Sequence, residues 1–233
     1  MIVQRSFALP SYAVFAAMLG IAGLPIYIHA PKFFVDTYGV SLSALGMALF
    51  FLRLLDFVQD PFLGKLAEST RKYRVMPIWT AGLVMALGMF GLFAVQAPIS
   101  PVLWFCLTLS AIFSGFSFLS IRFYAQGISS FGELGQLRLA RWRETGSLLG
   151  ICLAAMAPTL LLVFSENVFL LYAALFSGLI VVALMLMQQH WTTSPSLVPK
   201  TFSGSILTDP VIRQLLVLAV LNPAPVAVSS TLF

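Results

Sequence analysis

Long stretches of apolar residues with few charges constrain the fold of this sequence more than any other feature. Of its 233 residues, 60% are hydrophobic and only 9% are charged, whereas soluble domains carry about a quarter charged residues. A membrane-spanning helix needs about 20 apolar residues, and stretches of that length recur along the chain. Glycine and proline are spread through these stretches, which lack the strict alternation of β-barrel strands. We therefore predict an all-α polytopic membrane protein and exclude a soluble globular one.

Seven membrane spans account for the apolar stretches. The expected spans cover approximately 8–30, 41–64, 75–96, 101–124, 143–164, 168–188 and 213–233. Longer polar links are expected at 65–74, 125–142 and 189–212. The sequence thus predicts a six-helix transmembrane bundle over 1–188, a cytoplasmic connector over 189–212 and a seventh helix over 213–233. The last segment ends without a polar tail, which indicates that the seventh helix is truncated.

The distribution of basic residues predicts the topology. Of the 13 Lys and Arg, Lys32 alone lies on one side and Arg53 lies within a span. The other eleven lie at the N-terminus or in and beside the three long links: Arg5, Lys65, Arg71, Lys72, Arg74, Arg122, Arg138, Arg141, Arg143, Lys200 and Arg213. Because Lys and Arg stay on the cytoplasmic side, we expect a multi-pass protein of the cell (inner) membrane with a cytoplasmic N-terminus. The expected partner is the lipid bilayer and not nucleic acid, because the basic residues alternate with apolar stretches.

The second span carries three ionisable residues within eight positions, Arg53, Asp56 and Asp60. At about 100° per residue, Asp56 lies about 60° and Asp60 about 20° from Arg53 around the helix, so the three share one stripe. Each charged group near the bilayer centre costs about 2.5 to 3.5 kcal/mol, or about 7 to 10 kcal/mol for three. This cost excludes a stripe that faces lipid.

Two interpretations of the stripe stay open. In one, Arg53 forms a structural ion pair with Asp56, and Asp60 reaches water near the cytoplasmic interface. In the other, the carboxylates form a proton or cation site that opens on a central cavity. One Arg cannot neutralise two Asp, and intramembrane carboxylates commonly mark ion pathways, so we favour the second interpretation.

Small and aromatic residues elsewhere indicate packing and anchoring. Gly146 and Gly150 form a small-xxx-small pair that favours close helix packing. The four tryptophans fall near predicted helix ends, where interfacial anchoring is expected: Trp79, Trp104, Trp142 and Trp191. The sequence contains two His and no nucleophile-elbow, HExxH or Walker-type motif. We therefore predict no enzyme, no cofactor and no metal centre other than a site for a coupling cation.

The pattern Arg53-x-x-Asp56-x-x-x-Asp60-Pro61-x-x-Gly64 resembles the second helix of the glycoside–pentoside–hexuronide:cation symporters, the melibiose permease-like group of the major facilitator superfamily. Four further segments are similar to that family: the first helix and outer turn over 24–46, the loop over 64–72, the entry to helix five over 138–143 and the start of helix seven over 209–213. The resemblance implies the first half of a twelve-helix fold and part or all of helix seven.

The resemblance also implies roles for individual residues. The implied cation-binding residues are Asp56, Asp60, Gln59 and Ser117. The implied substrate-binding residues are Arg143, Tyr124 and Ser120, and the implied ion-pair or gating residues are Arg53, Glu68 and Arg71. Ser120 and Gly20 stand where melibiose permease has acidic residues for its sugar, which argues against a melibiose-like galactoside.

Three hypotheses for function follow. The leading one is a secondary active transporter, or a fragment of one, that couples H⁺ or Na⁺ to the symport of a sugar or other small organic solute by alternating access. The second is a truncated or half-size membrane protein without independent transport, whose partner is the missing C-terminal half or a second copy. The third is a major facilitator efflux pump.

Overall fold

The chain is helical throughout the part that the structure describes. The computed structural model describes residues 2–191, 210, 213–214 and 217–218, and only the backbone of 2–7, 24–25 and 132–134. Contacts divide the chain into one compact unit over Met1–Thr193 and a second over Ser194–Phe233. In the second unit, the described residues of the expected seventh helix, among them Arg213 and Leu218, are helical, and the other residues of that helix lie outside the described ones.

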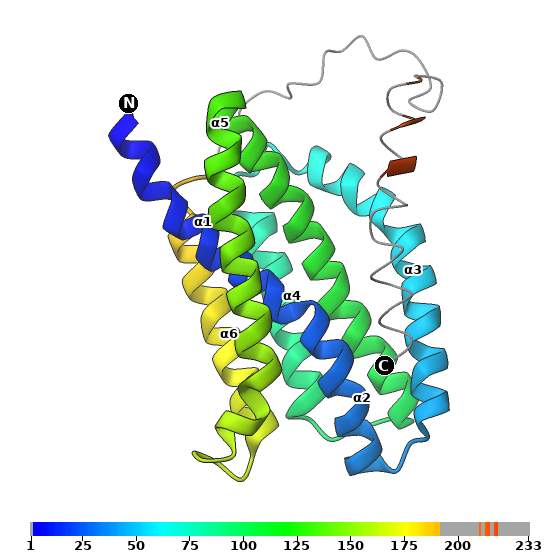
Figure 1. Ribbon diagram of the computed structural model, residues 1–233. Coiled ribbons are helices and arrows are strands. Elements are labelled where there is room, and N and C mark those ends of the chain that lie inside the picture. Colours follow the sequence, from blue (N-terminus) through cyan, green and yellow to red (C-terminus); the bar gives the residue numbers. More distant parts are fainter. Residues whose placement is uncertain (1, 192–209, 211–212, 215–216, 219–233) are drawn as a thin grey trace. The chain divides into compact units, whose positions relative to one another are not determined.

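The first unit is an all-α bundle (Figure 1). Its helices are α1 (Ile2–Ala22), α2 (Leu24–Tyr38), α3 (Leu42–Ser69), α4 (Met76–Phe93), α5 (Pro101–Leu161) and α6 (Val168–Met187). They provide six segments long and apolar enough to cross a membrane, because α1 and α2 together form one span and α5 contains two. The prediction of an all-α polytopic membrane fold is confirmed.

The first span is longer than expected and is not one continuous helix. It runs over Ala8–Tyr38 and is interrupted at Gly23, whose N–H donates to the Gly20 carbonyl at 3.3 Å. A proline in the first turn of α2 suits a helix start, because its missing N–H would have no partner there. The span ends at Gly39, which adopts a left-handed conformation with φ 65°.

The expected polar link over 125–142 is helical in the structure, and the spans on both sides extend into it. Helix α5 is assigned without a break over Pro101–Leu161, and its two spans are Pro101–Phe131 and Gly135–Leu161. The chain folds back between them: Gln136 Nε2 donates to the carbonyl oxygens of Gly127 and Ile128, both at 3.3 Å. Nine residues of straight helix would separate these groups by about 13 Å. The two arms of α5 descend side by side from the fold-back in Figure 1.

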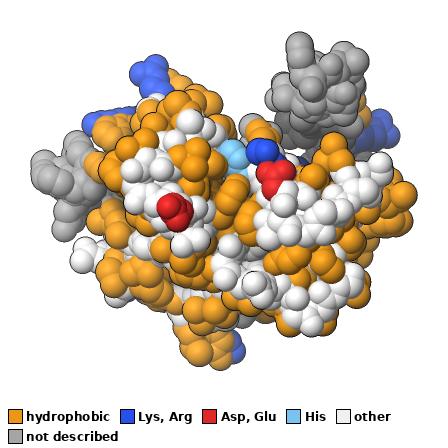
Figure 2. Space-filling model, turned by 90° about the horizontal axis from the view of Figure 1, so that it is seen from below, with side chains coloured by type: hydrophobic (Ala, Val, Ile, Leu, Met, Phe, Trp, Pro, Cys, Tyr) orange, Lys and Arg blue, Asp and Glu red, His pale blue; other side chains and the backbone are white. Residues whose placement is uncertain are grey.

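The loops of the bundle fall into two groups at opposite ends. The start of α1, the α3–α4 loop, the α5 fold-back and the end of α6 lie at one end (Figure 1). Figure 2 views the opposite end, where few charged side chains lie among apolar ones. Arg122, expected beside the link over 125–142, lies within the Pro101–Phe131 span and is 7% exposed.

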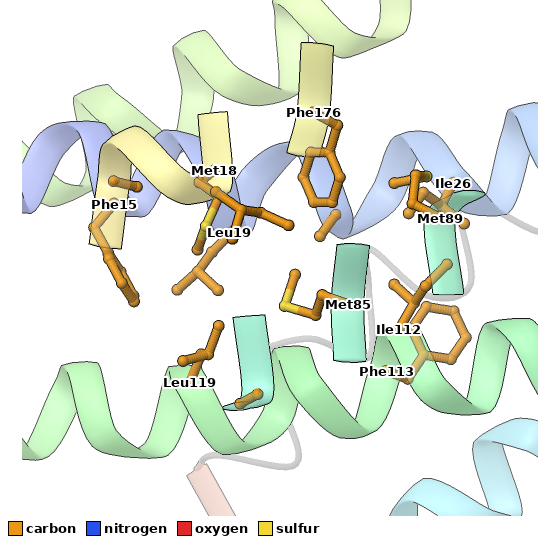
Figure 3. Packing of buried hydrophobic residues seen from close by; sticks show 14 of the residues in the cluster. Phe15, Met18, Leu19, Ile26, Met85, Met89, Ile112, Phe113, Leu119 and Phe176 are labelled. Carbon is orange, nitrogen blue, oxygen red and sulfur yellow. The ribbon is translucent and has the colours of Figure 1, made fainter. Parts of the chain in front are cut away.

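The core lies where α1, α4, α5 and α6 meet. Apolar side chains from these helices and α2 interdigitate (Figure 3), among them Phe15, Met18, Met85, Leu119 and Phe176. Such packing, without a hydrophobic driving force between helices, holds membrane bundles together.

The predicted packing role of the glycine pair is confirmed. A Cβ added at Gly146 would lie 2.1 Å from the Ala13 carbonyl oxygen, and one at Gly150 would lie 2.2 Å from that of Ala17. The backbones of α1 and the Gly135–Leu161 arm therefore touch, and no side chain fits between them.

The end of α6 is fixed to the bundle by the α3–α4 loop. Arg74 Nη2 donates to the Gln189 carbonyl at 3.0 Å, and its Nε donates to the Trp191 carbonyl. The Trp191 ring is 1% exposed and packs edge-on against Phe15. Interfacial anchoring by Trp191 is thus wrong, because its ring lies in the core. The expected connector beyond it, 192–209 with Lys200, lies outside the described residues.

Candidate functional site

Helix α3 carries the candidate cation site. The helix starts after Ser41, whose hydroxyl accepts from the Ala44 N–H at 3.3 Å, and it continues past Pro61 to Ser69. Its uninterrupted turns place Asp56 one turn after Arg53 and Asp60 one turn after Asp56, as the spacing predicts.

Asp56 is the most enclosed of the three ionisable groups. Its side chain is 17% exposed, and its Oδ2 lies 3.9 Å from Arg53 Nη1, a long separation for an ion pair. Gln59 Nε2 donates to Asp56 Oδ1 at 3.2 Å. Asp60 is exposed, and within the described part of the chain it forms no ion pair. The structure thus joins Asp56 to Arg53 and Gln59 and leaves the charge of Asp60 unpaired.

Arg53 is held in place by an aromatic residue that the sequence did not single out. Its guanidinium carbon lies 4.4 Å from the centre of the Tyr27 ring on α2. Tyr27 in turn stacks on Phe113 of α5, with ring centroids 4.9 Å apart. A cation over a ring face is attracted by the ring quadrupole. Three helices therefore meet around Arg53, and no local sequence signal marks Tyr27 as its partner.

Ser114, rather than Ser117, contacts the amide beside Asp56. The Ser114 hydroxyl lies 3.3 Å from Gln59 Oε1 and 2.6 Å from the Ser110 carbonyl oxygen. Ser117 is half-buried and makes no hydrogen bond within the described residues. The two serines are three residues apart on one helix face, so the sequence alone could not separate them.

The three expected substrate-binding residues line one cavity of about 290 Å³ between α1 and α5: Ser120, Tyr124 and Arg143. The Arg143 guanidinium carbon lies 4.3 Å from the centre of the Tyr124 ring. Glu144 also lines the cavity, and its Oε1 lies 3.1 Å from Arg143 Nη2. Glu144 was not among the residues expected from the sequence, although its position next to Arg143 could have pointed to it.

Two of the three expected ion-pair or gating residues, Glu68 and Arg71, lie at or near the link over 65–74 that is predicted to face the cytoplasm, whereas Arg53 lies beside Asp56. Arg71 Nη1 and Glu68 Oε2 form an ion pair at 3.5 Å. Arg122 Nη1 donates to the Ala67 carbonyl at 3.0 Å, and these four residues line a cavity of about 60 Å³. Arg122 thereby joins α5 to the end of α3. A role in gating stays a prediction.

The two candidate sites use different residues. The described residues that line the α1–α5 cavity do not include those of the cation cluster on α3. Within the described part of the chain, no three His, Cys, Asp or Glu side chains are grouped to hold a metal ion.

Comparison with known proteins gives one match. A family model described as MFS/sugar transport protein matches residues 7–232. No curated protein sequence matches the chain. No solved structure matches it.

Proposed function

Because the chain belongs to the MFS/sugar transport protein family, which its match over residues 7–232 shows, we propose that it takes part in cation-coupled sugar symport. The coupling cation is H⁺ or Na⁺, and the solute is a sugar or a similar small organic molecule. The membrane is the cell (inner) membrane, with the N-terminus in the cytoplasm. The basic α3–α4 loop and the N-terminal Arg5 support this orientation, because Lys and Arg favour the cytoplasmic side.

The carboxylate of Asp56 carries the proposal. Asp56 is enclosed within a membrane span, with Gln59 Nε2 at 3.2 Å and Arg53 Nη1 at 3.9 Å. With Asp60 one turn further, the cluster has one negative charge more than it has positive charges. Excess negative charge inside a bilayer is costly, and binding a cation removes that cost.

Two further oxygen atoms suitable for Na⁺ belong to Gln59, which contacts this carboxylate, and to Ser114, which contacts Gln59. When the single Ser114 proton points to the Ser110 carbonyl, 2.6 Å away, the Ser114 oxygen keeps its lone pairs. Gln59 Oε1, 3.3 Å from it, keeps its lone pairs as well. A proton needs only a carboxylate oxygen, so the same cluster serves either ion.

Coupling follows if the cation binds one conformation better than the other. A ligand shifts a conformational equilibrium only by its differential affinity for the two states. Arg53 is bound to Asp56 on α3 and lies over Tyr27 on α2, so a cation that displaces it would change a contact between two helices. The sugar would occupy the α1–α5 cavity against Tyr124 and Arg143.

Uptake of radiolabelled sugars into proteoliposomes tests the proposal. We expect the full chain to give uptake that depends on an imposed H⁺ or Na⁺ gradient, and Asp56→Asn to abolish the dependence. Asp36→Asn is the matched control, because Asp36 is 60% exposed and pairs with Lys32 outside the cluster.

Other outcomes would contradict the proposal. Gradient-dependent uptake that persists in Asp56→Asn would show that another group couples the cation. No uptake by any preparation, with the chain folded, would favour a half-size protein without transport of its own. Gradient-driven export of drugs without sugar uptake would favour an efflux pump.

A further inference from the structure

The cavity between α1 and α5 contains one positive and one negative side chain. Among the described residues that line it, Arg143 and Glu144 are the two with a formal charge. Glu144 Oε1 lies 3.1 Å from Arg143 Nη2 and 3.3 Å from its Nε. The cavity as a whole therefore carries no net charge.

Both the face and one edge of the Arg143 guanidinium are occupied. Tyr124 covers the face with its ring centre at 4.3 Å, and Glu144 accepts along the edge. Arg143 keeps N–H donors that Glu144 does not use, but a solute carboxylate bound to them would lie beside the Glu144 carboxylate. Like charges repel, so the cavity opposes such a solute.

An uncharged solute with several hydroxyl groups meets no such opposition. It finds a carboxylate acceptor in Glu144, further N–H donors on Arg143 and hydroxyl groups on Ser120 and Ser147. The rings of Tyr124 and two phenylalanines supply an apolar surface for the sugar ring. A volume of about 290 Å³ lies at the lower end of ligand pockets, which span about 300–1,000 Å³, and suits a monosaccharide.

We infer that Glu144 is a specificity-determining residue: by neutralising Arg143 it restricts the cavity to uncharged polyhydroxy solutes and excludes sugars that carry a carboxylate. The inference rests on the proposed function, because it assumes that the α1–α5 cavity binds the sugar. It narrows the class of solute to uncharged sugars, and it gives a role to Glu144, which is not one of the substrate-binding residues expected from the sequence.

Matched sugar pairs test the inference. Glucose and glucuronate, galactose and galacturonate, and mannose and mannuronate differ in one carboxylate each. We would measure their affinities for the purified full chain in nanodiscs of zwitterionic lipid at pH 7. The wild type should prefer the neutral member. Glu144→Gln frees Arg143 for a solute carboxylate, so the ratio of affinities should move toward the uronate by about tenfold or more.

Two further variants sharpen the test. Arg143→Gln should move the ratio in the opposite direction, because it leaves the Glu144 carboxylate unpaired in the cavity. Glu166→Gln removes an exposed carboxylate from the link before α6 and should leave the ratio unchanged. Thermal unfolding checks that each variant is folded, and the 61% exposure of the Glu144 side chain leads us to expect that Glu144→Gln folds.

The outcomes separate this inference from the proposed function. Equal affinities in the wild type, or an unchanged ratio in Glu144→Gln, would overturn the role of Glu144 even if uptake depends on Asp56. A neutral preference that Glu144→Gln reverses would uphold it even if uptake proves independent of any cation gradient. Absence of binding for every matched sugar would overturn it as well.

Discussion

The Ser114 hydroxyl on α5 lies 3.3 Å from Gln59 Oε1 on α3, and this contact connects the candidate cation cluster to a neighbouring helix. Gln59 also contacts Asp56, because its Nε2 donates to Asp56 Oδ1 at 3.2 Å. Gln59 thus contacts both the Asp56 carboxylate and a side chain of α5.

Removing the Ser114 hydroxyl should weaken cation dependence. If the coupling ion is Na⁺, Ser114→Ala should raise the Na⁺ concentration for half-maximal uptake roughly threefold to tenfold, as expected for one lost oxygen contact. Ser117→Ala is the matched control and should leave it unchanged. A larger effect for Ser117→Ala would mean that Ser117, as the family resemblance implies, and not Ser114 is the cation ligand.

Replacing the Tyr27 ring should release Arg53. We expect Tyr27→Leu to reduce the free energy of unfolding in detergent by about 0.5–1 kcal/mol from the lost cation–π contact alone. Tyr27→Phe keeps the ring under the guanidinium, whose carbon lies 4.4 Å from the ring centre, and should keep most of the stability. Equal loss in both variants would show that the Tyr27 hydroxyl, and not its ring, stabilises the bundle.

A methyl group at Gly146 should separate two helices. Its Cβ would lie 2.1 Å from the Ala13 carbonyl oxygen, so Gly146→Ala should lower the free energy of unfolding by about 1–3 kcal/mol. Gly178→Ala on α6 is the matched control, because no other part of the described chain lies within 4 Å of the added carbon. It should be neutral or slightly stabilising. Similar melting temperatures for both variants would contradict the close contact between α1 and α5.

Loss of the Arg74 side chain should loosen the end of α6. Without its hydrogen bonds to the Gln189 and Trp191 carbonyls, Arg74→Ala should increase quenching of tryptophan fluorescence by acrylamide, because Trp191 is buried in the wild type. Lys72→Ala, which removes a cation over the Tyr73 ring in the same loop, serves as the control. Unchanged quenching in Arg74→Ala would show that ring packing alone holds Trp191.

The sequence predicts the spans well because bilayer thickness fixes the length of an apolar helix. It cannot predict that the first span breaks at Gly23 or that α5 folds back while helical, since both depend on contacts between helices. Gln136, for instance, satisfies Gly127 and Ile128 only once the two arms lie side by side.

For the candidate site, too, the arrangement within one helix is predictable from the sequence, and the contacts between helices are not. The spacing of Arg53, Asp56 and Asp60 gives one helical stripe from local geometry alone. Tyr27 and Ser114 could not be assigned, because the residues that face α3 depend on how the bundle packs. Burial of Arg122 could not be predicted either, because a cation at the end of a span is expected to reach the membrane surface unless its partner, here the Ala67 carbonyl, is known.

The spans that carry Asp56 and Arg143 are the two least buried by the rest of the described chain. In each, 17% of the most apolar window is buried, against 39–50% in the other four spans. Side chains such as Phe57 and Leu149 therefore meet acyl chains, detergent or other protein at their outer surfaces. Whatever covers these surfaces, lipid or other protein, therefore packs directly against the two spans that carry the candidate sites.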